Sequence, residues 1–238
     1  MKLTLRHYYD FGPHRPVVGA DLVTPDAWDA LRIKTTGAFS IPTTRAEFLR
    51  VAEERHDIAE RARAIDSWLE ERGARVVASY GVGGATLEWC LLRLRPERKL
   101  ILTDYGKATV ERLAGLFPEA DVRFHDLRRD EPLGANVHLF HRVETEFSNS
   151  EWREVLQRFR RVPLLVVAAD VLDLRRLLIE LRNRPALRRR GATKAGFIRT
   201  RAALEALWRS THDARRVQMY DLEGWELLPR EGHVPTPG

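Results

Sequence analysis

Four residues in the middle of the chain have the types and spacing of a nucleoside-binding site. Gly81 and Gly83 lie in a glycine-rich turn directly after a short apolar run, and Asp104 lies 23 residues after Gly81. Glycines at such a turn let a ligand approach the backbone and the N-terminus of the next helix. A carboxylate that ends the following strand can accept hydrogen bonds from both hydroxyls of a ribose. Asp126 ends the strand after that one, so the pattern indicates a nucleoside-containing ligand.

Titratable residues that could move a proton follow the next apolar run. His141 and Glu144 are the candidates, because both come at or just after the end of that run. His138 lies inside the run, and we expect it to be structural. The sequence has no HExxH motif, no Walker lysine and no Gly-x-Ser-x-Gly elbow, so we expect no metal and no hydrolase of those classes.

Alternating strands and helices are expected to position these residues. Short apolar runs predict strands at Val76–Ser79, Lys99–Thr103, Val122–His125, Asn136–Phe140 and Leu164–Ala169. Helical spacing of apolar residues predicts helices at Ala85–Leu94, Thr109–Phe117, Glu151–Phe159 and Val171–Arg184. This alternation is typical of a parallel sheet with right-handed crossovers.

The N-terminal part of the chain follows another pattern. Residues 1–42 contain scattered proline and glycine and are expected to be irregular, apart from a short helix at Pro25–Ile33. From Thr43 the apolar spacing predicts one long helix or two in succession, with Gly73 as the stop signal. We therefore expect an irregular segment and helical cap over residues 1–73.

The C-terminal quarter breaks the strand–helix alternation. We expect a basic loop at Arg188–Gly196, a helix at Thr200–Trp208, and strands at Arg216–Tyr220 and Trp225–Leu228. The connection between those two strands is too short for a crossover helix, so they must pair antiparallel. The expected core covers residues 74–230, with an insertion near the pocket at residues 171–196 and a tail at residues 231–238.

Composition limits the class of protein. The chain has 238 residues, of which 44% are hydrophobic and 31% charged, which excludes a fibrous or fully disordered chain. Its single cysteine, Cys90, excludes an intramolecular disulfide and a cysteine-cluster metal site. The net charge of +6 comes from arginines spread among acidic residues, and only the stretch that ends in Arg188, Arg189 and Arg190 is locally dense. Nucleic acid is therefore a candidate partner, but not the favoured one.

The order of these motifs resembles that of the class I S-adenosylmethionine (SAM)-dependent methyltransferases. The family's motif acidic-x-Gly-x-Gly-x-Gly is similar to residues 79–85, which begin at Ser79. The resemblance implies a cofactor site in which Ser79, Gly81 and Gly83 form the loop, Asp104 and Tyr105 hold the ribose, Asp126 and Leu127 hold the adenine, and His141 follows the fourth strand. It implies a three-layer, Rossmann-like α/β fold of seven strands, mostly parallel with a C-terminal antiparallel hairpin, plus the N-terminal helical cap.

Three residues depart from the family pattern. Ser79 stands at the acidic position of the motif and lacks the negative charge of an acidic residue. Ala85 stands at the position of the third glycine, where alanine is tolerated only if the backbone φ is negative. Thr145 stands where many small-molecule O-methyltransferases of the family have a catalytic histidine. The family's commonest base therefore does not carry over, and His141 and Glu144 remain the nearest catalytic candidates.

The resemblance implies methyl transfer from SAM to a small-molecule acceptor. Three alternatives stay open: a nucleic-acid methyltransferase, an NAD(P)-dependent oxidoreductase, and a catalytically degenerate, methyltransferase-like binding module. We expect no membrane association, because no uncharged apolar run approaches the ~20 residues of a spanning helix. The N-terminal sequence lacks the apolar stretch of a secretory signal, so we expect a cytoplasmic protein. The oligomeric state is unknown, and a homodimer is compatible with the sequence.

Overall fold

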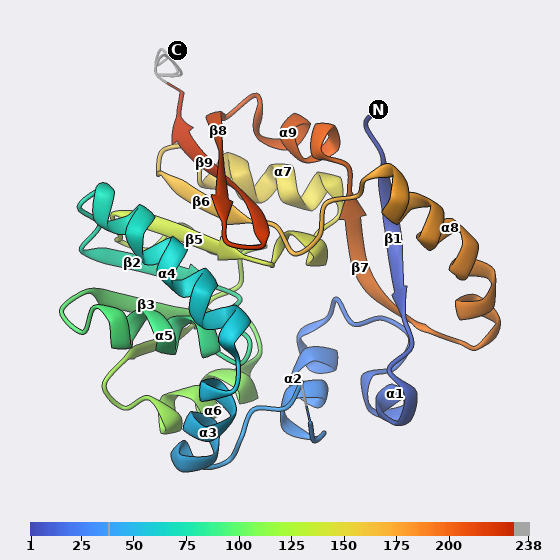
Figure 1. Ribbon diagram of the computed structural model, residues 1–238, viewed down its shortest axis with the longest axis horizontal. Helices are drawn as coiled ribbons and strands as arrows, with labels where there is room; N and C mark the ends of the chain where they lie inside the picture. Colours follow the sequence, from blue (N-terminus) through green and yellow to red (C-terminus); the bar gives the residue numbers. More distant parts are fainter. Residues whose placement is uncertain (38, 231–238) are drawn as a thin grey trace.

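A seven-stranded sheet forms the centre of the computed structural model, which describes residues 1–37 and 39–230 (Figure 1). The strand order is β4-β3-β2-β5-β6-β9-β8. Five strands are parallel: β2 (Val76–Tyr80), β3 (Lys99–Asp104), β4 (Asp121–Phe124), β5 (Val137–His141) and β6 (Leu164–Val167). At one edge β9 (Leu222–Pro229) is antiparallel to both β6 and β8 (His212–Met219). The expected seven strands and closing hairpin are confirmed.

Helices cover both faces of this sheet and make the expected three layers. One face is packed by α3 (Arg45–Glu53), α4 (His56–Glu71), α5 (Thr86–Leu94) and α6 (Lys107–Leu116). The other face is packed by α7 (Asn149–Arg158) and α9 (Arg201–Trp208). Strand side chains alternate between the two cores, so Val77 and Leu139 belong to the first and Ala78 and Phe140 to the second.

Local signals explain where several helices begin and end. Thr44 caps α3 through its side chain, which accepts from Glu47 N at 3.3 Å. Ser148 and Glu151 form a complete capping box at the start of α7. Gly73 follows α4 with a φ of +59°, a conformation that favours glycine. The stretch after Thr43 is two helices in succession, one of the two expected forms.

A second, two-stranded sheet corrects two sequence predictions. β1 (Thr4–Tyr9) pairs antiparallel with β7 (Thr193–Arg199), beside the main sheet (Figure 1). The expectation that residues 1–42 are irregular is wrong for β1, and the basic loop predicted at Arg188–Gly196 overlaps the start of β7. Each strand finds its hydrogen-bond partner about 190 residues away, a pairing that no local pattern encodes. This pairing ties the N-terminal segment to the C-terminal half of the chain.

Apart from the short 3₁₀ helix η2 (Glu144–Glu146), the remaining helices belong to the N-terminal segment or directly precede β7. They are η1 (Gly12–His14), α1 (Arg15–Val18), α2 (Pro25–Ile33) and α8 (Leu174–Arg189). The helix expected at Pro25–Ile33 is confirmed, and α8 runs further than the expected Val171–Arg184. No helix among residues 1–37 and 39–230 is both long enough and apolar enough to cross a bilayer. The predicted tail, residues 231–238, lies outside the described residues.

Candidate functional site

The glycine turn after β2 has the backbone that its composition predicts. Gly81 and Gly83 have φ angles of +63° and +58°, which side chains rarely adopt. A Cβ atom on Gly81 would lie 2.5 Å from Val143 Cγ1, so the turn also depends on glycine for space. The expected negative φ at Ala85 is wrong: this residue has a φ of +54° and precedes α5 in the left-handed region. Its methyl group is buried under the turn, and α5 begins at the next residue.

Asp104 and Asp126 lie at the same edge of the sheet. β3 and β4 are parallel neighbours, with Asp104 paired to Phe124, and His125 N donates to the Asp104 carbonyl oxygen at 3.0 Å. Asp126 follows directly. Parallel neighbouring strands end at one edge, so the spacing of the two acids correctly predicted their proximity.

The Asp104 carboxylate is buried and accepts hydrogen bonds from both sides. Its Oδ1 accepts from Gly106 N at 2.9 Å, and its Oδ2 accepts from Gly83 N at 3.1 Å. Arg32 of α2 donates a third bond to Oδ2 at 2.9 Å, and its own side chain is only 7% exposed. The Asp104 carboxylate therefore connects the glycine turn, the start of α6 and helix α2.

A small cavity opens beside Gly81 at this edge. It has a volume of about 20 Å³, room for roughly one water molecule. Four of the predicted cofactor residues line it, together with residues that the sequence reasoning did not select. The predicted ones are Gly81, Tyr105, Asp126 and Leu127; the others are His125, Arg128, Val143, Glu146 and Phe147. The cavity does not reach Ser79, Gly83, Asp104, His141 or Glu144.

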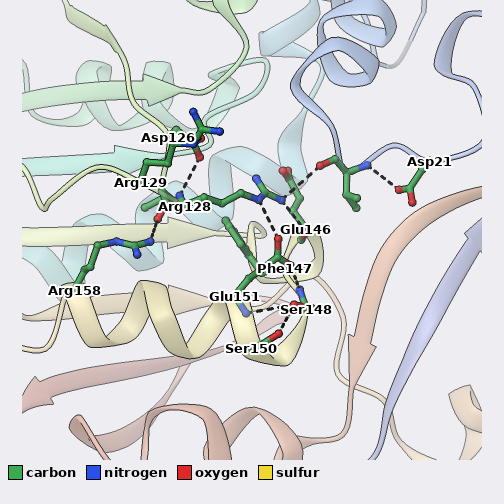
Figure 2. Close-up of polar contacts among 12 residues, drawn as sticks. Asp21, Asp126, Arg128, Arg129, Glu146, Phe147, Ser148, Ser150, Glu151 and Arg158 are labelled. Atoms are coloured by element: carbon green, nitrogen blue, oxygen red, sulfur yellow. Dashed lines mark hydrogen bonds and ion pairs between the residues drawn. The ribbon is translucent and has the colours of Figure 1, made fainter.

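Arg128 holds the wall of this cavity together (Figure 2). Its Nε donates to Glu151 of α7 at 3.2 Å, and its Nη2 donates to the carbonyl oxygen of Glu146 at 3.2 Å. Its guanidinium carbon lies 4.7 Å from the centre of the Phe147 ring. Its backbone N–H donates to Asp126 Oδ1 at 2.9 Å. One arginine thus joins the loop after β4 to the loop after β5.

Glu146 is an acidic residue of the cavity that the sequence analysis did not select. It lies in the short 3₁₀ helix η2 (Glu144–Glu146) and directly follows Thr145, the position of the family's histidine. Burial raises the pKa of its carboxyl to about 7, although the nearby Arg32 charge opposes that shift. A carboxyl group with such a pKa exchanges its proton near neutral pH. Its place next to Thr145 was the available signal in the sequence.

A carboxylate does lie under the glycine turn, although Ser79 has none. The Ser79 hydroxyl donates to Glu88 Oε1 at 2.6 Å, and both side chains are buried. Glu88 comes from the first turn of α5, so a buried acidic group lies beside Ser79. Burial raises the pKa of the Glu88 carboxyl to about 7, and its bond with Ser79 opposes the rise.

The raised pKa of Glu88 predicts a pH-dependent stability. A carboxyl whose pKa is higher in the folded than in the unfolded chain stabilises the fold most when it is protonated. This contribution is complete below about pH 4.5 and is lost as the pH rises to about 7. Relative to Glu88→Gln, the wild type should lose about 2–4 kcal/mol of unfolding free energy over that range. Urea unfolding of both proteins at several pH values measures it, with Glu111→Gln on the exposed face of α6 as control.

His141 and Glu144 lie away from this cavity. Glu144 is buried, and its Oε1 accepts from Ala169 N at 2.7 Å, which ties the loop after β5 to the end of β6. His141 pairs with Val167 at the end of β5, and its Nε2 has no hydrogen-bond partner within the described chain. Burial and the charge of Arg142 lower the pKa of its imidazole to about 3. Neither residue lines the cavity, and His138, which bonds Tyr80 Oη at 3.0 Å, is buried as expected.

The strand order, the antiparallel β9 and the glycine turn after β2 define the Rossmann-like fold of the SAM-dependent methyltransferases. The sequence matches no protein-family model and no curated protein. Among solved structures, human N-acetylserotonin methyltransferase in complex with SAM is 18% identical, with a TM-score of 0.58, over 77% of this chain and 56% of that one. PigF with S-adenosylhomocysteine (SAH) is 12% identical, with a TM-score of 0.61, over 93% and 63%.

A third solved structure agrees with these two. An O-methyltransferase family protein from Burkholderia thailandensis is 17% identical, with a TM-score of 0.55, over 87% of this chain and 60% of that one. The chain thus spans between 56% and 63% of the lengths of these three structures. The likeness establishes the fold.

Proposed function

We propose that this chain is a SAM-dependent methyltransferase that acts on a small-molecule acceptor. The observation that carries the proposal is the position of Asp104 and Asp126 at one sheet edge, beside a glycine turn with left-handed backbone. The matching structures named above support it, because two of them were determined with SAM or SAH. Bound at this edge, SAM would supply an electrophilic sulfonium methyl group.

The residues at this edge fit the cofactor in kind. Asp104 has the charge and position to accept ribose hydroxyls, and Asp126 has a partly exposed carboxylate that lines the cavity. The buried Glu88 carboxylate under the turn offers an acceptor near the loop that would hold the methionine part. Ser79, Tyr105 and Leu127 complete the proposed set, in which His141 has the weakest geometric support.

The protein's own contribution to methyl transfer is to align two reactants and exclude water. A base is needed only where the acceptor is protonated at the working pH. Between His141, Glu144 and Glu146, we propose Glu146 as the base, because it lines the cavity and its pKa is about 7. Arg128 holds the backbone carbonyl oxygen of Glu146 in the cavity wall.

Glu146→Gln should slow methyl transfer to a phenolic acceptor about 10- to 100-fold and remove the rise in rate between pH 6 and 8. Release of SAH with a panel of small phenols and amines, followed across that range, measures both effects. Glu119→Gln, an exposed carboxylate of the loop after α6, is the control. An unchanged pH profile in Glu146→Gln would exclude it as the base.

Isothermal titration of the wild-type protein with SAH tests the cofactor directly. Heat of binding with SAH and none with NADH supports the proposal. Binding of NADH instead would support the oxidoreductase alternative, which the antiparallel β9 disfavours.

A further inference from the structure

Helix α2 is held on the proposed cofactor site by charged groups. Arg32 Nη1 lies 2.9 Å from Asp104 Oδ2, and both side chains are almost completely buried. Asp29, one turn earlier, accepts from Ala108 N at 3.1 Å and from Thr109 N at 3.0 Å at the start of α6. α2 thus places the Arg32 guanidinium on Asp104, the carboxylate proposed to bind the ribose. It also places the Asp29 carboxylate on the N-terminus of α6, where a negative charge is favourable.

The same helix also occupies the space next to the glycine turn. A Cβ atom on Gly83 would lie 3.3 Å from Arg32 Nη2, so the guanidinium rests on the backbone of the turn. The Arg32 guanidinium carbon is 4.8 Å from the centre of the Trp28 ring, and this ring covers the guanidinium. The remaining cavity of about 20 Å³ is far below the ~300 Å³ of a typical small-molecule site.

The apolar side of α2 belongs to a separate small core. Ala27 and Leu31 pack in one cluster with Phe11, Val18 and Leu22 of the N-terminal segment. Apart from Ile33, which packs on the main core, the contacts of α2 with the sheet edge described above are ion pairs and hydrogen bonds. Hydrogen bonds and ion pairs are only modestly more stable than the same groups in water, so α2 can separate from the sheet edge while its small core stays packed.

We propose that α2 is an autoinhibitory plug, and that the nucleoside of the cofactor can reach Asp104 only after Arg32 has left it. This inference rests on the proposed function. Arg32 and the ribose hydroxyls compete for the same oxygen atoms, so the affinity for the cofactor is reduced by the fraction of molecules with α2 displaced. With a minor state of about 1–10%, removal of the plug would raise the affinity about 10- to 100-fold.

A reversible lock tests the proposal without loss of the fold. A Cβ atom on Gly106 would lie 3.0 Å from Asp29 Cγ, and the φ of Gly106 is −81°, so Asp29→Cys with Gly106→Cys can form a disulfide across this contact. Titration with SAH compares the oxidised and reduced double variant. We expect at least tenfold weaker binding when oxidised and recovery with dithiothreitol. Equal affinity in both forms would overturn the plug.

The variant Arg32→Ala provides a second, independent test of the plug. We expect about 10- to 100-fold tighter SAH binding and faster hydrogen exchange at the amides of α2, measured without cofactor. Arg50→Ala, which removes an exposed arginine from the surface pair with Glu54, is the matched control. Weaker binding in Arg32→Ala would make Arg32 a cofactor ligand and overturn the plug. Failure of the proposed function would give a different result. Neither SAM nor SAH would then bind to any form of the protein, including Arg32→Ala and the reduced double variant. That result would overturn both the proposed function and the plug.

Discussion

Asp104→Asn is expected to weaken SAH binding by about 1,000-fold. The change removes a charge that two ribose hydroxyls would share, and each hydrogen bond to a charged group contributes about 1.5–3 kcal/mol. Isothermal titration measures the loss. Asp104 and Arg32 form one ion pair, yet their substitutions should change affinity in opposite directions, because Asp104 binds the cofactor and Arg32 competes with it.

The stability of Asp104→Asn must be measured alongside. Without its partner, Arg32 is a buried and unpaired cation, which favours displacement of α2 and limits the loss of stability to about 1–3 kcal/mol. The double variant Arg32→Ala with Asp104→Asn removes both charges and should recover part of that stability while still failing to bind SAH. Binding by this double variant with wild-type affinity would contradict the role of Asp104.

Arg199→Met should lower the free energy of unfolding by about 3–5 kcal/mol. Arg199 is 1% exposed and bonds two residues of the segment between β5 and α7 and the first residue of α7. Its Nη1 donates to the Glu144 carbonyl oxygen at 2.7 Å, its Nε donates to Asn149 Oδ1 at 2.8 Å, and its Nη2 donates to the Phe147 carbonyl oxygen. Methionine keeps the volume but removes this donor from the buried carbonyl oxygens of Glu144 and Phe147, which carries the full cost of their desolvation.

Urea unfolding of Arg199→Met and Arg201→Met gives the comparison. Arg201 lies two residues further along, and its ion pair with Glu223 is exposed, so its loss should cost less than about 1 kcal/mol. Burial lowers the pKa of the Arg199 guanidinium to about 10, which reflects how completely water is excluded there. Equal destabilisation by both changes would show that the buried contacts add nothing beyond a surface pair.

Arg199 also links the small sheet to the candidate site. It is the last residue of β7, and its donors hold the backbone on either side of Glu146. The strand β7, whose start lies within the basic loop predicted at Arg188–Gly196, therefore fixes the segment that carries the proposed base. The division of the chain at residue 73 remains a prediction, since β1 and β7 tie both sides of it together.

The local pattern of the sequence was sufficient for the seven strands of the main sheet, the helices between them and the turn at Gly81. Each depends on apolar spacing or on glycine backbone freedom within a few residues, and parallel pairing then places Asp104 beside Asp126. Only the tertiary structure could reveal Arg32 on Asp104, Glu88 under Ser79, β1 paired with β7, and Glu146 in the cavity. These contacts join segments separated by many residues or depend on which side of an element is buried. Desolvation, which raises the pKa of Glu88 and of Glu146, exists only in the folded chain.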